Sequence, residues 1–530
     1  MRHVHRFIRL TPALALCLVA WQAQAQSFRV QCPSSTITHP DPSKTGINDV
    51  EPAYMGPTTL APGAAGYLVP TSKVNGAIKC QQISGGDGYA TMGDGTQTYM
   101  FSFGPLSGLY DISQGLPGTQ PPGVFNATYA GSNLLSPGDP ATQIDGGSAF
   151  NYNGAVGQVP DADAGGAIDG HVDPRQIMDV GVMNGNIPAP LMAIDEDDEF
   201  FLTLTNVGMI MRPDLFEQHT VHFHGYPNAS AFYDGVPDAS VAINIGASFT
   251  YYYLAPDAGT YFWHCHITPP EHLQMGMVGQ LYVRPRQNRV PAGSSLYGAL
   301  AQQQTDLRTA CNTASDILCS NPLPPTNTVA RAATGKYAYN DGDGSTYYDV
   351  EYPIQIHGFD PNFHFVGMTF NPEGFSDMKD KYFLLNGRSY PDTVTTGPLE
   401  TQSADGVKHF SQPLPAVINI PAGGKALLRI SDLDVSEYQT LASLGIPMRV
   451  IGYNAKLLRD QSGNNLAYTT NSITLAGGES LDVILDTSTG KPDGTAYQAG
   501  EIYYLYTPNL DHLSNDAENF GGLMTEVHII

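Results

Sequence analysis

The chain has 530 residues and a formal net charge of −25, although only 14% of its residues are charged. A surface this acidic repels phosphate backbones and anionic membranes, which argues against a nucleic-acid-binding role. Hydrophobic residues make up 42% of the sequence, and the 56 glycines and 40 prolines favour turns and short strands over long helices. The length predicts two to four domains.

The first 25 residues have the features of an export signal. The basic start MRHVHRFIR precedes the apolar run LTPALALCLVAW, and Ala23-Gln24-Ala25 has the small-x-small spacing found before a cleavage site. No later apolar run reaches the ~20 residues needed to cross a bilayer. We therefore expect an exported protein, periplasmic or extracellular, without a membrane span.

The mature chain would keep an odd number of cysteines, because Cys17 leaves with the signal. Cys265 stands between two histidines. The other four can pair in an oxidising compartment, Cys32 with Cys80 and Cys311 with Cys319, although the sequence leaves other pairings open. The unpaired thiol of Cys265 is the one expected to have a chemical role.

Short apolar runs bounded by Gly, Pro, Asn and Asp recur from about residue 85 to the C-terminus. Examples are FFLTLTNVG, SFTYYYL, GQLYV, ALLRISDL and EIYYLYT. These are strand signals, and no amphipathic helix competes with them. The pattern predicts an all-β fold built from sandwich or barrel domains.

The composition divides the mature chain into four segments. We expect an N-terminal extension (26–84), a strand-rich domain (85–290), a linker (291–344) and a second strand-rich domain (345–530). Within the first domain, residues 110–185 are rich in Gly, Pro, Ala and Asp, which predicts a long inserted loop.

The two strand-rich segments share an order of features and are predicted to be duplicated copies of one fold. AIDEDDEFFLTLTN and AGTYFWHCH in the first have counterparts in AVINIPAGGKALLRISD and AGEIYYLYT in the second. Six residues after Gly259 stands Cys265, whereas six after Gly500 stands Tyr506. The second copy therefore lacks the ligand candidates of the first.

Two windows, HTVHFHG (219–225) and YFWHCHITPPEHLQMGM (261–277), concentrate potential metal ligands. Alternate residues of a strand share a face, so His222 and His224 should point away from His219. By the same parity, His264 and His266 should oppose Cys265. The windows therefore divide into two sets of ligands.

The first set is His219, Cys265, His272 and a methionine, with Met277 favoured over Met275. Two imidazoles, a thiolate and a thioether are the ligands of a blue copper electron-transfer site, and zinc would leave the methionine unexplained. The second set is entirely imidazole and suits coppers that bind and reduce an oxygen species; it comprises His222, His224, His264 and His266.

Both windows resemble the copper-binding motifs of the multicopper oxidase family. YFLLNGRSYPDT, GIPMRVIGYNAKLL and GGLMTEVHI resemble the copper-free cupredoxin domain of that family. The resemblance implies two cupredoxin-like Greek-key domains and one-electron oxidation of a phenol or metal ion coupled to reduction of O2. Its type 1 copper ligands would be His219, Cys265, His272 and Met277; His222 would serve type 2 copper, and His224, His264 and His266 the type 3 pair.

In that arrangement the catalytic residues would be Cys265, His264 and His266, because the flanking histidines give electrons a through-bond route from the sulfur to the second set.

The sequence departs from the family pattern in two ways. CHITPPEH is two residues longer than the common family spacing, and a complete trinuclear cluster would use eight histidines where this chain has four. We hypothesise that two copies meet across a two-fold axis and complete the cluster as a homo-oligomer.

Two other functions remain open. A copper nitrite reductase, which the chain also resembles, would have an aspartate at His222 and an alanine at His266. A non-catalytic copper-binding or electron-carrier protein would need no further histidines.

Several remaining features predict structural roles. DEDD at 195–198 is expected to be a solvated turn that could attract a metal ion if it lies near the type 1 copper. NDGDGSTYYDVE at 340–351 does not fit the EF-hand spacing and predicts an exposed turn. His357 and His364 are expected in core or surface positions.

Overall fold

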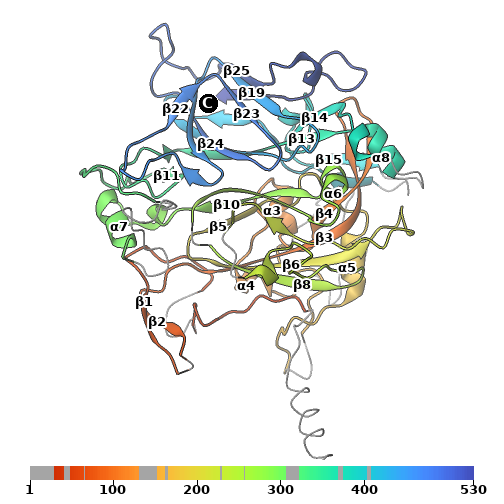
Figure 1. Ribbon diagram of the computed structural model, residues 1–530, viewed down its shortest axis with the longest axis horizontal. Helices are drawn as coiled ribbons and strands as arrows, with labels where there is room; N and C mark the ends of the chain where they lie inside the picture. The colour runs from red at the N-terminus through yellow and green to blue at the C-terminus, as the bar shows by residue number, and fades with distance from the viewer. Residues whose placement is uncertain are drawn as a thin grey trace, which may run out of the picture.

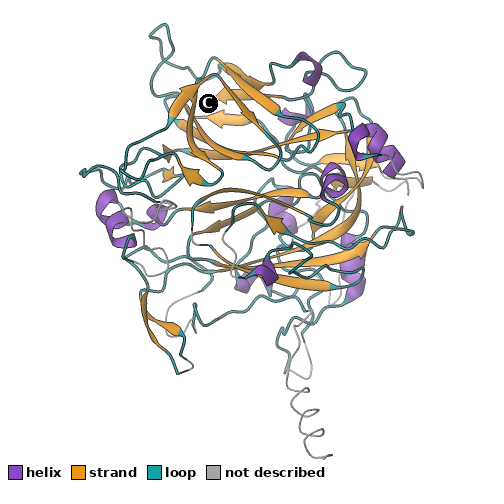
Figure 2. Ribbon diagram, viewed as in Figure 1, coloured by secondary structure: helices purple, strands orange, loops and turns teal. Residues whose placement is uncertain are grey.

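The computed structural model describes residues 29–40, 48–64, 66–129, 152–160, 165–226, 230–255, 257–305, 321–367, 374–402 and 408–530. Strands hold 37% of the residues and helices 12%, which confirms the all-β prediction. The strands form two stacked β-sandwiches, with short helices at their periphery (Figures 1 and 2). The expected signal peptide, Cys311 and Cys319 lie outside the described residues. None of the described helices is long and apolar enough to cross a membrane.

The first sandwich has two four-stranded sheets. One has the order β4 (Gln97–Pro105), β3 (Ile78–Thr91), β6 (Glu199–Gly208) and β8 (Ser248–Leu254); the other has the order β5 (Met192–Asp195), β10 (Val278–Arg284), β9 (Gly259–His264) and β7 (His222–Phe223). β3 pairs with β6 and β5 with β10 in parallel, and the other pairs are antiparallel. Every residue of EFFLTLTNVG in β6 is buried, as expected for a central strand covered on both faces.

The second sandwich repeats this order. Its larger sheet runs β14 (Tyr382–Leu385), β13 (Val350–Phe359), β18 (Lys425–Asp432), β24 (Ser480–Asp486), β20 (Met448–Tyr453) and β21 (Lys456–Leu457), with β22 (Tyr468–Thr470) paired to β20; its smaller sheet runs β17 (Ile418–Ile420), β26 (Met524–Ile529), β25 (Ile502–Tyr506), β19 (Gln439–Leu444) and β23 (Ser472–Leu475). Strands β13 and β18 are parallel, like β3 and β6, and β17 and β26 are parallel, like β5 and β10. The matching order supports a duplicated fold, with β19 and β25 in the places of β7 and β9.

Three hairpins and several short helices lie outside these sheets. The hairpins are β1 (Thr59–Pro62) with β2 (Leu68–Ser72), β11 (Lys336–Tyr337) with β12 (Tyr347–Tyr348), and β15 (Leu399–Gln402) with β16 (Lys408–Ser411). The α-helices are α3 (Leu109–Ser113), α4 (Pro122–Phe125), α5 (Pro174–Gly181), α6 (Pro269–Gln274), α7 (Leu296–Gln303) and α8 (Pro361–Gly367); the 3-10 turns are η1 (Ala231–Tyr233), η2 (Arg286–Arg289), η3 (Phe375–Asp377), η4 (Asp392–Val394) and η5 (Leu510–His512). The expected insertion 110–185 thus contains most of α3 and all of α4 and α5.

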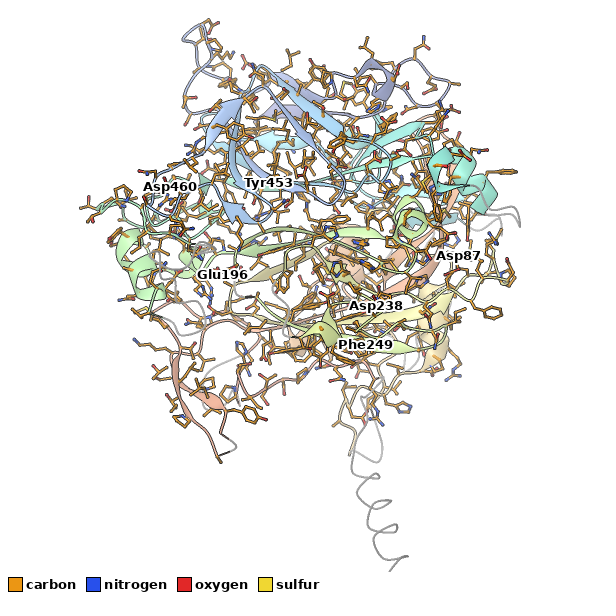
Figure 3. All side chains as sticks on the ribbon, in the orientation of Figure 1. Asp87, Glu196, Asp238, Phe249, Tyr453 and Asp460 are labelled. Atoms are coloured by element: carbon orange, nitrogen blue, oxygen red, sulfur yellow. A yellow bond between two sulfur atoms is a disulfide. The ribbon has the colours of Figure 1, made fainter. Side chains whose placement is uncertain are left out.

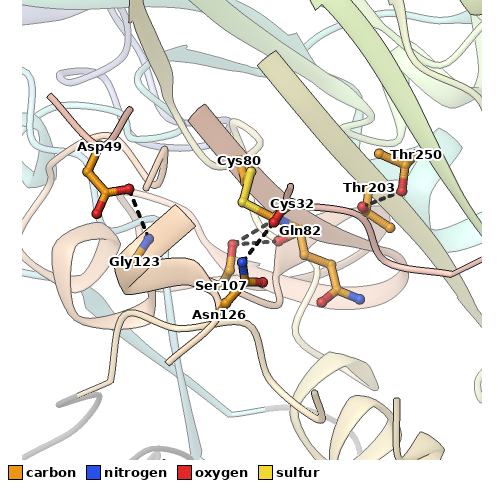
Figure 4. Close-up of a disulfide and its surroundings, with 9 residues drawn as sticks. All are labelled: Cys32, Asp49, Cys80, Gln82, Ser107, Gly123, Asn126, Thr203 and Thr250. Atoms are coloured by element: carbon orange, nitrogen blue, oxygen red, sulfur yellow. Dashed lines mark hydrogen bonds between the residues drawn. A yellow bond between two sulfur atoms is a disulfide. The ribbon is translucent and has the colours of Figure 1, made fainter. Parts of the chain in front are cut away.

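A disulfide attaches the N-terminal segment to the first sandwich. Cys32 is bonded to Cys80 in β3, as predicted, and Asn126 Nδ2 donates to the Cys32 carbonyl at 2.7 Å (Figure 4). Because β3 begins at Ile78, the last residues of the expected extension (78–84) form part of a central strand.

The two acidic stretches are not solvated turns, so both predictions were wrong. Glu196, Asp197 and Asp198 are buried. Arg286 Nε donates to Asp197 at 2.7 Å, and Glu196, at the boundary between the sandwiches (Figure 3), accepts from the Arg286 backbone N–H at 2.7 Å. The cations that neutralise this cluster lie about ninety residues further along the chain, where local sequence cannot reveal them.

The acidic loop at 340–351 is likewise ordered by internal hydrogen bonds. The buried carboxylate of Asp341 accepts from the backbone N–H groups of Gly344 and Thr346, both at 2.8 Å, and from Gln287 Nε2 at 2.8 Å. The Asp341 carboxylate oxygens therefore accept hydrogen bonds from protein groups. Through Gln287, the loop also connects η2 to the second sandwich.

A buried ion-pair network joins the sandwiches at β10 and β13. Glu351 accepts from Arg284 at 2.7 Å and from Arg429 at 3.0 Å, and both guanidinium groups lie over the Tyr282 ring. Burial alone would raise the pKa of Glu351, but Arg284 and Arg429 outweigh it and hold the pKa at about 2. A carboxylate with a lowered pKa stabilises the fold above its ordinary pKa and loses that contribution as the pH falls.

Glu351→Gln is expected to lower the free energy of unfolding at pH 7 by about 3 kcal/mol, because it removes the carboxylate paired with Arg284 and the closer of the two carboxylates paired with the buried Arg429. Denaturant unfolding at pH 7 and at pH 3 measures this. The difference between wild type and variant should shrink as the pH falls through the range between the ordinary carboxyl pKa and about 2. A difference independent of pH would contradict the account.

Candidate metal centre

The sulfur cluster consists of His219, Cys265 and His272, whose ligand atoms all lie within 4.8 Å of one another. All three side chains are fully buried. His219 precedes β7, Cys265 follows the last residue of β9, and His272 lies in α6, so the cluster forms where three segments meet. Cys265 is a free cysteine, in keeping with its predicted exclusion from the disulfides.

The neighbours of Cys265 lower the pKa of its thiol. Burial would raise the pKa of Cys265, but His272 and His219 lower it well below its ordinary value. Burial would lower the pKa of His272, yet Cys265 and Glu217 raise it to about 9. His272 Nδ1 lies 3.2 Å from Sγ, and the Thr220 backbone N–H donates to Sγ at 3.4 Å. The surroundings therefore favour the thiolate form of Cys265, which is the form that binds copper.

A glycine in β3 makes room for the third member of the sulfur cluster. A Cβ built on Gly85 would lie 2.7 Å from Cδ2 of His219. The His219 ring is fully buried, and neither of its nitrogens has a hydrogen-bond partner in the described part of the chain. Because buried polar atoms are normally paired, this ring has the environment of a metal ligand.

The imidazole cluster consists of His222, His224 and His264, with the His266 ring beside it. The ligand atoms of the first three lie within 4.8 Å of one another, and the His266 ring centroid is 5.0 Å from that of His222. β7 pairs with β9 so that His222 lies directly opposite His264. The strand register therefore brings together the four histidines that parity assigned to one set.

Backbone carbonyls orient these imidazoles. His222 Nδ1 lies 2.8 Å from the Asp234 oxygen, His264 Nδ1 2.6 Å from the Cys265 oxygen, and His224 Nδ1 3.4 Å from the Gly478 oxygen. A neutral ring that donates from Nδ1 has a free lone pair on Nε2. The Nε2 atoms of His224 and His264 face each other at 3.0 Å.

Burial favours the neutral form of His224 and His264. It lowers the pKa of His224 to about 4, with help from His222, and it lowers the pKa of His264 well below its ordinary value. At their separation of 3.0 Å, one Nε2–H can donate to the other ring, and in the tautomer with both protons on Nδ1 the two Nε2 lone pairs can bind one cation. Neutral imidazole is the form that binds copper.

One short segment joins the two clusters. Cys265 follows His264 and precedes His266 in the chain, and Thr220 touches both sides: its N–H donates to Cys265 Sγ, and its hydroxyl accepts from the His266 N–H at 2.9 Å. The sulfur and the imidazoles are thus connected by covalent bonds and by a second hydrogen-bonded route.

Met277 and Met275 are both fully buried in the core that contains Cys265. The Met277 carbonyl accepts from the Cys265 N–H at 3.1 Å. The donor set, with a thiolate, neutral imidazoles and nearby thioethers, fits copper better than zinc.

The remaining described histidines lie outside both clusters. His39 pairs with Glu199 at 2.7 Å, and His512 pairs with Glu437 at 3.0 Å. Strand parity could not identify the supporting residues Gly85, Glu217, Thr220 and Gly478. Each of them acts through a close approach of its backbone or through a contact with a distant segment. For Gly85, the local sequence offered only the pair of glycines at the end of IKCQQISGG.

The segment that carries both clusters matches a known family. Residues 169–288 match the sequence profile of the family described as multicopper oxidase. This segment is similar to a multicopper oxidase domain. It contains every histidine of both clusters and Cys265.

Curated relatives are similar to part of the chain. The laccase abr2 of Aspergillus fumigatus is 31% identical over 128 residues, which cover 24% of this chain and 20% of the laccase. The copper-containing nitrite reductase of Rhizobium meliloti is 34% identical over 112 residues, 20% of this chain and 26% of the reductase. The chain spans only about a fifth to a quarter of the length of these relatives.

Among solved structures, a blue copper oxidase from Nitrosomonas europaea is similar with a TM-score of 0.45 and 18% identity, covering 85% of each chain.

Gly85→Ala is expected to displace the His219 ring and to weaken the binding of added Cu(II) at the sulfur cluster by about 10-fold or more. Visible absorption during a copper titration measures this, because the Cys265 thiolate of the sulfur cluster gives an intense absorption when it binds Cu(II). Gly298→Ala, in the surface helix α7, is the control for a glycine substitution in the described fold. Undiminished thiolate-to-copper absorption in Gly85→Ala would contradict the assignment of His219.

Proposed function

We propose that the protein is an exported multicopper oxidase that takes single electrons from a reductant at the sulfur cluster and uses them to reduce O2 at the imidazole cluster. The observation that carries this proposal is the position of Cys265, which joins the sulfur cluster to the imidazole cluster through both neighbouring histidines. Copper bound at the two clusters would supply the one-electron chemistry and the site of O2 reduction.

The proposed ligands follow the two clusters. His219, Cys265 and His272 would hold the type 1 copper, with Met277 as the axial ligand. His222 would hold the type 2 copper, and His224, His264 and His266 would contribute to the type 3 pair. The carbonyls of Asp234, Cys265 and Gly478 keep Nε2 of three of these rings directed toward the metal.

The reductant would approach on the side of His272 that faces Glu217. His272 Nε2 lies 3.6 Å from a Glu217 carboxylate oxygen, and the Glu217 side chain is 26% exposed. The neighbouring Phe216 is 83% exposed. A carboxylate beside an exposed aromatic ring suits either a metal cation or a phenol, the two reductant classes that we propose.

A second copy of the chain would complete the imidazole cluster. This chain brings four histidines together, and the other described histidines lie outside both clusters. The His222 and His266 side chains are only half-buried. Two copies that present these faces to each other across a two-fold axis would supply eight histidines.

Cys265→Ser is expected to abolish the thiolate-to-copper absorption and to reduce the rate of O2 consumption by at least about 10³-fold, because serine is a poor copper ligand and breaks the electron route. His171→Ala, at an exposed histidine outside both clusters, is the matched control. If Cys265→Ser keeps its oxidase rate, the proposed function is wrong.

A nitrite reductase is the second candidate, favoured by the match to the Rhizobium meliloti enzyme. Anaerobic protein reduced at the sulfur cluster should be reoxidised by O2 and not by nitrite if the oxidase proposal is right. Reoxidation by nitrite alone would favour the reductase, and reoxidation by neither would favour an electron carrier.

Copper content and mass separate the complete cluster from a partial one. Sedimentation and metal analysis of fully loaded protein should give an oligomer with two or more coppers per chain. An active monomer, or a copper content well below two per chain, would rule out the shared cluster.

A further inference from the structure

The second sandwich holds the short helix that carries His272. The carbonyls at the end of a helix lack their usual donors within the helix. His357 Nε2 lies 2.9 Å from the Leu273 carbonyl oxygen, and His364 Nε2 lies 2.9 Å from the Gln274 carbonyl oxygen. Both histidines are fully buried and come from β13 and α8 of the second sandwich. Figure 1 shows α6 and α8 near each other at the boundary between the sandwiches.

The same helix is held by a side-chain clamp. Gln274 is fully buried; its Oε1 accepts from the Asp360 N–H at 2.9 Å, and its Nε2 donates to Asp380 at 3.0 Å. A buried amide with both ends bonded to one partner domain has a single orientation. Because Gln274 is two residues from His272, the clamp fixes where the His272 ring lies.

A second contact from the same sandwich reaches the imidazole cluster. The Gly478 carbonyl faces Nδ1 of His224, and a Cβ on Gly478 would lie 2.9 Å from Nδ1 and from Cε1 of that ring. Gly478 has φ +92°, a left-handed conformation that favours glycine. No other residue type fits this position without moving His224.

The two contacts are joined within the second sandwich. The Ser436 hydroxyl lies within hydrogen-bonding distance of both Asp380 and Asp434. A Cβ on Gly477 would lie 1.9 Å from the Asp434 carbonyl, so the loop that carries Gly478 packs directly on the Asp434 backbone. A cleft of about 390 Å³ opens beside this contact, and its lining includes His224, Gly478 and Tyr438.

We propose that the copper-free second sandwich positions the metal ligands of both clusters: His357, His364 and the Asp360–Gln274–Asp380 clamp set the place of His272, and the Gly478 carbonyl sets the place of His224. The inference rests on the proposed function, since it assigns positioning residues for the same two copper sites. The second sandwich, which lacks the copper-ligand candidates of the first, would then have the role of positioning the ligands of the first.

Gly478→Ala tests the contact with the imidazole cluster. The variant should bind copper at that cluster at least about 10-fold more weakly, the usual effect of losing a residue that orients a ligand, while the thiolate-to-copper absorption stays that of wild type. Gly423→Ala is the matched control, because Gly423 has φ +75° and nothing within 4 Å of its Cβ position. It carries the same backbone strain without touching a histidine.

Asp380→Leu tests the clamp. It should shift the thiolate-to-copper absorption maximum and the reduction potential of the sulfur cluster, whereas Asp380→Asn, which can still accept from Gln274, should restore wild-type values. Gln274→Met removes the same hydrogen bonds with little change of volume and replaces Asp380→Leu if that variant does not fold.

The outcomes are separable. Wild-type protein that binds no copper overturns the proposed function. Two other outcomes overturn this inference alone, provided that wild type shows both copper signals. One is a Gly478→Ala variant that binds copper as Gly423→Ala does. The other is a folded clamp variant with the absorption and the reduction potential of wild type.

Discussion

The pairing of β7 with β9 is the constraint on which the site depends. His222 lies opposite His264 in this register, and the alternation of side chains places Cys265 on the other side of the strand end. A shift of one residue in either strand would turn the ligands of that strand to the opposite faces and break up both sets. One backbone register therefore produces two chemically different clusters a single residue apart.

Much of this arrangement follows from the sequence because it is local. Period-two alternation over HTVHFHG and FWHCH is enough to separate His219 and Cys265 from the other histidines, and strand signals with turn residues identify the all-β fold. Among the described cysteines, the free thiol of Cys265 and the Cys32–Cys80 disulfide were also predicted from the sequence.

The parts that the sequence could not reveal are contacts between distant segments. DEDD has the composition of a turn, but Arg286 and Arg289 neutralise Asp197 within the core. His357 and His364 give no local sign that they bind the end of α6. Tertiary charge pairing and backbone approach decide such positions, and neither leaves a periodic pattern.

The most direct test of the account is a copper-edge anomalous diffraction map of copper-loaded crystals. We predict separate peaks, one between His219, Cys265 and His272 and at least one at the Nε2 atoms of His222, His224 and His264. A map without a peak at Cys265, or with copper only at surface carboxylates, would contradict it.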